Sequence, residues 1–245
     1  MEDPIISVAS ILSSSIGISI DQLQLSFGII GVILLATAHF RASNGGGILS
    51  VFGWPIIGLF FYLDIPHYID ISDPVLIVMS AAGLPITVLL AIWEFKMYRA
   101  NIEDESIIWT RGLVALGAGP YLIIANIPYL NVAAVWLTAF SANFFLGFSG
   151  IEGYELGSVI VDTGVSDVNW SEWNGNRWVL TEQLGDAGFY IPLIKQVDGT
   201  TEVGFVMACS AMQSMAVFIG ALWAIRTAPW KRRMRAAIIT IPTIF

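Results

Sequence analysis

The sequence predicts an all-α polytopic membrane protein with about seven to eight transmembrane helices and one small extracytoplasmic cap. Of its 245 residues, 56% are hydrophobic and only 12% are charged, and the mean hydropathy is +0.75. A soluble domain carries about 25% charged residues, so most of the apolar surface here must face lipid or other helices. Uncharged runs such as residues 112–151 supply the roughly 20 apolar residues that each crossing helix needs.

The charged residues are distributed unevenly along the chain. Nine of the nineteen acidic residues lie within residues 152–202, and five of the eleven basic residues lie between Arg226 and Arg235. This separation is typical of membrane topology, and no nucleic-acid partner is expected. Because cytoplasmic loops are enriched in Lys and Arg, the basic cluster predicts a cytoplasmic turn and the acidic segment an extracytoplasmic one.

Residues 1–149 are predicted to form the N-terminal transmembrane helices. The first residues lack the basic region of a cleaved signal peptide, so the first apolar segment is expected to belong to the mature protein. That segment, residues 5–20, is rich in serine and forms either a short span or an interfacial helix. Clearer spans are predicted at residues 23–40, 48–63, 74–93, 107–127 and 131–148.

The orientation of the early loops depends on whether every predicted span crosses. With all spans intact, Arg41 and the loop at residues 96–105 lie outside the cell, which strains the rule that basic loops face inward. The alternative is that residues 131–148 are re-entrant, which turns both loops to the inside. We prefer the intact count at this point.

The rest of the chain divides into three segments. Residues 150–203 predict an extracytoplasmic segment with strand-like runs, too short and polar to bury a large core alone and therefore expected to cap the helices. Residues 204–226 predict a helix that carries the only cysteine. Residues 227–245 predict a basic cytoplasmic turn and a further transmembrane helix that stops partway, so the natural protein is expected to be longer.

The lone cysteine, Cys209, is the main candidate for chemistry. It lies in an uncharged run at residues 203–225, about 9 Å below the start of a predicted helix at 1.5 Å per residue. On such a helix Cys209 shares one face with Gln213, Ala216 and Gly220. A lone thiol is usually a small buried hydrophobe. Its expected place near the outer surface, with Gln213 and Ser214 beside it, favours a reactive thiol instead.

The run at residues 208–220, Ala-Cys-Ser-Ala-Met-Gln-Ser-Met-Ala-Val-Phe-Ile-Gly, resembles the cysteine motif of the archaeosortase/exosortase family, in its archaeosortase A form. The resemblance implies a membrane-embedded cysteine transpeptidase. Such an enzyme cleaves the C-terminal tripartite signal of surface proteins near a Pro-Gly-Phe-type motif and transfers the protein to a membrane lipid. Cys209 would be the nucleophile, Gln213 and Ser214 would bind substrate, and no cofactor is implied.

The family's other catalytic residues are basic, and the resemblance places them after Phe245. Arg232, Arg233 and Arg235 are expected a membrane thickness from the thiol and receive no catalytic role. We therefore expect this chain to fold without being active. Processing of a labelled, signal-bearing substrate by the 245-residue chain would refute that expectation.

The sequence offers little support for a serine-protease site or a metal site. Residues 147–150, Gly-Phe-Ser-Gly, match the motif of rhomboid-type serine proteases at Ser149, but both histidines precede it and no later helix supplies a base. A metal site is not expected, because His39, His67 and Cys209 are far apart in sequence. His39 is expected at the membrane interface beside Arg41, and His67 in a solvated loop.

A transporter, a channel subunit or a structural membrane protein with an inert cysteine remains as an alternative. Glu94 and Arg111 are ionisable residues at or near the ends of predicted spans. Intramembrane charges mark ion pathways, but both side chains are long enough to reach an interface, and no span carries a charge at its centre.

Overall fold

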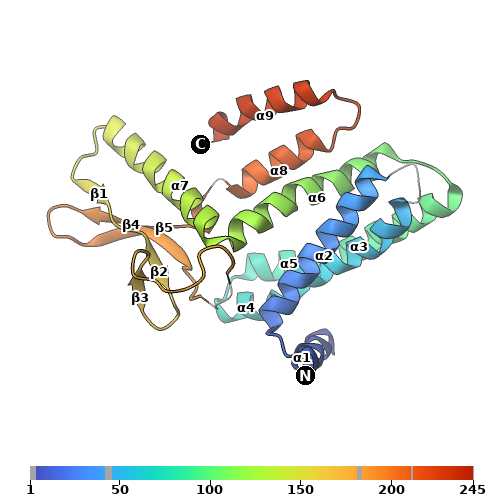
Figure 1. Ribbon diagram of the computed structural model, residues 1–245, viewed down its shortest axis with the longest axis horizontal. Coiled ribbons are helices and arrows are strands. Elements are labelled where there is room, and N and C mark those ends of the chain that lie inside the picture. The colour runs from blue at the N-terminus through green and yellow to red at the C-terminus, as the bar shows by residue number, and fades with distance from the viewer. Residues whose placement is uncertain (1–3, 42–45, 181–183, 211, 245) are drawn as a thin grey trace. The chain divides into compact units, whose positions relative to one another are not determined.

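The computed structural model describes residues 4–41, 46–180, 184–210 and 212–244 (Figure 1). The chain divides into two compact units. Unit 1 comprises Met1–Gly119 with Gly220–Pro229, and unit 2 comprises Pro120–Ile219 with Trp230–Phe245. Helix α6 (Glu105–Asn126) and helix α8 (Met212–Trp223) each contribute residues to both units.

Unit 1 is helical. A buried cluster of Leu35, Trp54, Ile57, Ala91 and Ala115 joins its central helices. Close helix packing depends on glycine: a Cβ on Gly31 would lie 2.6 Å from Cγ1 of Ile57, so only a hydrogen lets the two helices approach. Besides the first part of α6, the helices of this unit are α1 (Pro4–Ile16), α2 (Ile20–Phe40), α3 (Gly46–Tyr62), α4 (Ile65–Asp70) and α5 (Pro74–Ala100).

Local capping sets several of these helix ends. Ser19 and Gln22 form a reciprocal capping box at the start of α2. The Asp73 carboxylate accepts hydrogen bonds from two backbone N–H groups of α5, and Pro74 occupies the first helical position. Asn101, with φ of 51°, ends α5 in the left-handed conformation that asparagine tolerates.

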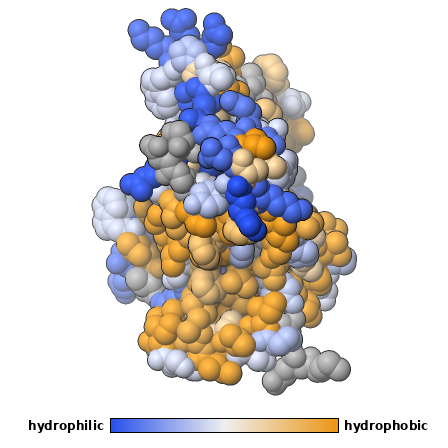
Figure 2. All heavy atoms as spheres, turned by 90° about the vertical axis from the view of Figure 1, so that its right-hand side faces the viewer, coloured by the Kyte–Doolittle hydropathy of each residue, from blue (hydrophilic) through white to orange (hydrophobic). Residues whose placement is uncertain are grey.

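Five helices in the described part of the chain are long and apolar enough to cross a membrane. They are α2, the α3–α4 segment Gly47–Asp70, α5, α6 and α7 (Pro128–Phe148). Large apolar side chains such as Ile33 and Leu89 are more than half exposed, as lipid-facing residues are, and Figure 2 shows a broad hydrophobic surface. The prediction of an α-rich, multi-pass membrane protein is confirmed, with five such helices where seven to eight were expected.

Unit 2 contains a sheet, so the prediction of an all-α protein is wrong for residues 154–206. All strand pairs are antiparallel, and β4 is central, with β5 along one edge and β1 and β2 along the other. The helices cannot supply partners for these polar backbone groups, whereas strand pairing does. The strands are β1 (Tyr154–Leu156), β2 (Ile160–Asp162), β3 (Asp167–Asn169), β4 (Phe189–Lys195) and β5 (Thr201–Val206).

The sheet packs on α7. Val135 and Ala139 of this helix are fully buried against Ile191 of β4. A second cluster places Val132 beside Val161, Trp173 and Phe189, with stacked and edge-on aromatic contacts among the rings. The segment thus has a small core of its own around Trp173, to which α7 adds Val132, and it shares a second cluster with Val135 and Ala139 of α7.

The predicted helix at residues 204–226 is wrong in its first third. Residues 203–206 belong to β5 and pair with residues 190–193 of β4. A short 3-10 turn, Met207–Cys209, follows, and α8 has only 12 residues. The helix α9 (Trp230–Ile244) then carries the basic cluster. Short apolar runs suit a buried strand as well as a helix, so hydropathy alone could not separate the two.

Candidate functional site

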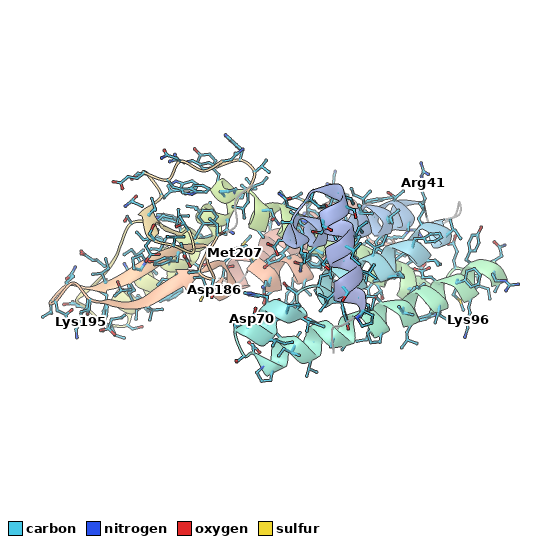
Figure 3. The ribbon with its side chains drawn as sticks, turned by 90° about the horizontal axis from the view of Figure 1, so that it is seen from below. Arg41, Asp70, Lys96, Asp186, Lys195 and Met207 are labelled. Atoms are coloured by element: carbon cyan, nitrogen blue, oxygen red, sulfur yellow. The ribbon has the colours of Figure 1, made fainter. Side chains whose placement is uncertain are left out.

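Cys209 lies in the turn that joins the sheet to α8, and it is exposed. Figure 3 shows Met207 at the end of β5 next to this turn, with Lys195 at the opposite end of the β4–β5 hairpin. The Ser210 hydroxyl donates to the carbonyl of Met207 at 2.6 Å and accepts from the backbone N–H of Met212 at 3.4 Å. Ser210 is buried and closes the turn, while the neighbouring thiol remains open to solvent or membrane.

Two sequence-based expectations for Cys209 are therefore wrong. The thiol does not lie inside a transmembrane helix, because α8 begins only at Met212. Its exposure argues against the alternative that Cys209 is a small buried hydrophobe. Its expected position on one helical face with Gln213, Ala216 and Gly220 fails for the same reason: Cys209 precedes the helix that carries the other three.

The expected substrate-binding residues Gln213 and Ser214 lie in the first turn of α8, and both are exposed. The Gln213 side chain donates from Nε2 to the hydroxyl of Tyr121 on α6, over 3.1 Å. This bond orients the amide and leaves its carbonyl oxygen available as an acceptor. No sequence pattern points to Tyr121, because the contact joins residues 92 positions apart.

A second polar site lies inside unit 1. Nε of Arg111 on α6 is 3.0 Å from Oε1 of Glu94 on α5, and the two side chains are only 5% and 2% exposed. Trp54 donates to the same carboxylate oxygen at 3.3 Å, and Arg111 donates from Nη1 to the carbonyl of Ala38 at 3.2 Å. The expectation that Glu94 and Arg111 reach an interface is wrong, because each finds buried partners on neighbouring helices.

A cavity of about 280 Å³ adjoins this ion pair. Its wall includes Glu94 and Arg111 and, from the turn between α5 and α6, Asn101, Glu103 and Asp104. The carboxylates outnumber the single guanidinium, so the cavity favours a small polar or cationic occupant. Among the described residues, no group of three His, Cys, Asp or Glu side chains is arranged to hold a metal ion.

His39 also departs from its expected place. It is 3% exposed, and its Nδ1 lies 3.0 Å from the carbonyl of Ile108. A Cβ on Gly112 would lie 2.6 Å from the His39 ring, so the glycine makes room for the imidazole. His39 is thus packed within unit 1 and not exposed beside Arg41. His67 is exposed, as expected, although it lies in the short helix α4.

Ser149 of the rhomboid-like motif ends α7. Its backbone N–H bonds to the carbonyls of Phe145 and Leu146, and Gly150 follows with a positive φ of 77°. This is the usual arrangement at a helix C-terminus, where glycine adopts the left-handed conformation. The glycine and serine of the motif are thus accounted for by the end of the helix.

Comparisons of the chain with protein-family models, with curated proteins and with solved structures find no match.

Proposed function

We propose that the protein is a membrane-embedded cysteine transpeptidase of the archaeosortase type, with Cys209 as its nucleophile. The proposed reaction cleaves surface proteins near a Pro-Gly-Phe-type motif in their C-terminal signal and transfers them to a lipid anchor. The observation that carries the proposal is the position of the chain's only thiol, exposed in the turn between the sheet and the apolar helix α8. The resemblance of residues 208–220 to the family's cysteine motif supplies the reaction class.

The chemistry needs two acyl transfers. The Cys209 thiolate attacks the scissile carbonyl carbon, the peptide C–N bond breaks, and the leaving amine takes up a proton to give a thioester. An amine or hydroxyl group of the acceptor lipid then attacks the thioester carbonyl and loses its proton. The thiolate leaves, so the enzyme returns to its starting state with no oxidation or reduction.

The location of the thiol suits a substrate whose scissile bond lies just outside its own membrane helix. The preceding strand β5 carries Glu202, and the following helix α8 has no charged residue. The thiol thus lies where the chain changes from polar to apolar. In the proposal Cys209 faces the extracytoplasmic side of the cell membrane, and Gln213 and Ser214, both exposed one turn later, contact the substrate backbone.

Labelling of the thiol in intact cells tests the proposal. A membrane-impermeant maleimide should modify Cys209 from outside, and Cys209→Ala provides the blank. A peptide containing the Pro-Gly-Phe-type motif and part of its membrane helix should slow the labelling, whereas a scrambled peptide of equal hydropathy should not. Labelling that requires unfolding, or that both peptides slow equally, would refute a substrate site at Cys209.

A second candidate function is transport of a small polar or cationic solute. The buried Glu94–Arg111 pair and its adjoining cavity favour it, because ionisable residues within membrane spans mark substrate and ion pathways. Two substitutions distinguish these functions. Glu94→Gln should abolish uptake in a transporter and leave peptide protection of Cys209 intact, and Cys209→Ala should leave uptake intact.

A further inference from the structure

Helix α7 has two contrasting faces. One face is buried and includes Pro128, Asn131, Ala134, Val135 and Ala139. The other is exposed and mostly apolar, with Ser141 among large side chains that are between 40% and 81% exposed. These exposed residues are Tyr129, Leu130, Trp136, Leu137, Phe140, Phe144, Phe145 and Phe148, of which Trp136 stacks on Phe140 and Phe144 on Phe148.

The buried face of α7 is covered by a charged sheet. The strands that pack along it, β1, β4 and β5, carry acidic and basic residues, including Glu155, Lys195 and Glu202. The same segment also reaches the N-terminal end of the helix, where the backbone N–H of Tyr129 donates to the carbonyl of Arg177 at 3.1 Å. The sheet lies beside the N-terminal half of α7, where the buried residues of the helix fall between Pro128 and Ala139 (Figure 1).

This packing is incompatible with a helix that crosses the bilayer. A crossing α7 would carry the sheet into the hydrocarbon layer, together with its charged side chains and the open edge of β5. Charged residues and open sheet edges facing lipid are excluded from that layer because their polar groups have no water to bind. By hydropathy and length alone α7 is a candidate span, but the sheet on its buried face excludes an orientation that crosses the bilayer.

We propose that α7 lies in the plane of the membrane interface, with its aromatic face docked on lipid and the sheet on the aqueous side. The occupant of the apolar face is lipid because α6, a candidate span, ends at Asn126 and α7 begins at Pro128. The aromatic face therefore starts at the bilayer. Aromatic side chains are favoured at this depth, and a helix with one apolar face lies flat there.

Unit 1 provides an independent observation. Arg226 and Glu105 line one small cavity, so the turn after α8 lies at the same end of unit 1 as the start of α6. Figure 3 shows Arg41 and Lys96 at one end of this helical unit and Asp70 at the other. The loop between α5 and α6 follows Lys96, so the basic residues Arg41, Lys96 and Arg226 share one end.

The chain returns antiparallel to α6. Gln213 at the start of α8 bonds to Tyr121, and the carbonyl of Ala221 near its end accepts from Trp109, so α8 runs beside α6 in the opposite direction. The turn after α8 therefore lies at the end of unit 1 where α6 begins.

The inference does not depend on the transpeptidase proposal. It reverses the preference for an intact count of spans and selects the arrangement in which residues 131–148 do not cross. It also leaves the basic residues Arg41, Lys96 and Arg226 of unit 1 on one side, as the positive-inside rule requires.

Spin-label depth measurements test it. In a Cys209→Ser background, single cysteines at Trp136, Phe140, Phe144 and Phe148 are labelled in the full chain reconstituted in vesicles. An interfacial α7 gives four similar, shallow depths, whereas labels at Ile86 and Leu89 of α5 report the bilayer interior. A depth that peaks in the middle of α7 would overturn the inference. Labels shielded from both oxygen and aqueous relaxants would also overturn it, because a protein partner would then cover the face.

A second experiment avoids substitutions in the apolar face. Val179 and Glu152 are exposed residues beside the N-terminal and C-terminal ends of α7, respectively. In the same background, Val179→Cys and Glu152→Cys should both react with an impermeant maleimide in intact cells. Reaction of only one of them would show that α7 crosses the membrane, and the inference would be wrong.

Discussion

Arg111 and Glu94 form an ion pair across 3.0 Å between α6 and α5, with almost no exposure of either side chain. The pair is held by Trp54, which donates to Glu94, and by the carbonyl of Ala38, which accepts from Arg111. Three helices other than α6 thus converge on the guanidinium or its partner. Removing either side chain would leave the other charge buried without a counter-charge, so the pair holds α5 and α6 together.

The first prediction concerns this pair. Arg111→Met leaves the Glu94 carboxylate buried without its cation, so the free energy of unfolding should fall by about 3–5 kcal/mol. Adding Glu94→Gln to Arg111→Met should recover much of the loss. Thermal unfolding of the detergent-solubilised protein measures both effects. Lys96→Met removes an exposed cation of α5 and serves as the control, with an expected change within about 0.5 kcal/mol. Equal losses in the two single variants would contradict the assignment.

The second prediction concerns the contact between α8 and α6. A Cβ on Gly220 would lie 2.6 Å from the carbonyl oxygen of Leu113 and 2.7 Å from the backbone nitrogen of Gly117. Backbone atoms cannot move aside as a flexible side chain can, so Gly220→Ala should lower the free energy of unfolding by about 1–3 kcal/mol.

Gly147→Ala is the matched control for that substitution. Gly147 also lies in a helix, but a Cβ there meets nothing within 4 Å. This substitution should be neutral or should raise the free energy of unfolding by up to about 1 kcal/mol, through the higher helix propensity of alanine. The packing argument fails if both alanine variants change the unfolding temperature in the same direction.

The third prediction separates the stability of the protein from the proposed chemistry of Cys209. Because the thiol is exposed, Cys209→Ala should change the free energy of unfolding by less than about 0.5 kcal/mol. Under the proposed function, the same substitution should abolish formation of any hydroxylamine-sensitive adduct with a signal-bearing substrate. A marked loss of stability would instead indicate a structural cysteine.

The fourth prediction concerns Tyr121 and Gln213. Tyr121→Phe removes the hydroxyl that accepts from Gln213 and keeps the ring, so the fold should be retained. Under the proposed function, the free amide should bind substrate less well, and protection of Cys209 by the signal peptide should need roughly tenfold more peptide, about the effect of one hydrogen bond. Gln213→Ala should give at least as large an effect. Unchanged protection in both variants would remove Gln213 from the site.

The fifth prediction concerns pH. Burial and the 2.9 Å hydrogen bond that the Tyr190 hydroxyl donates to Asp167 raise the pKa of Tyr190 above its ordinary value. Because the pKa of Tyr190 is higher in the folded state, the neutral phenol stabilises the folded protein. This contribution is fully present below the unfolded-state pKa of about 10, and it is lost as the pH rises through the folded-state pKa. Tyr190→Phe should flatten this alkaline loss in unfolding measurements. A wild-type curve and a variant curve that run parallel above pH of about 10 would contradict the assignment.

Several elements were predictable from the chain alone because their cause is local. The predicted spans at residues 23–40, 107–127 and 131–148 agree with α2, α6 and α7 to within a few residues. Apolar length, a capping Ser19 or Asp73 and a proline at the first helical position are sequence properties, and they act within one helix. The α-rich membrane class follows from the same properties.

Other features depended on partners distant in the chain. The composition of residues 203–206 is compatible with a helix or a strand, and these residues form a strand because they pair with β4. Glu94, Arg111 and His39 could each reach an interface by length, and only the buried groups around them hold them inside. The exposure of Cys209 follows from the late start of α8, which is a consequence of the same strand pairing.

The sequence by itself determined that this chain is an α-rich membrane protein, where most of its long helices lie, and that it has one thiol, because these depend on composition and on interactions within a few residues. Only the tertiary structure decided which apolar segment is a strand, which charges pair and which face of α7 a charged sheet covers. Backbone hydrogen bonds and charges must find partners wherever water is excluded, and in this protein those partners are far away in sequence.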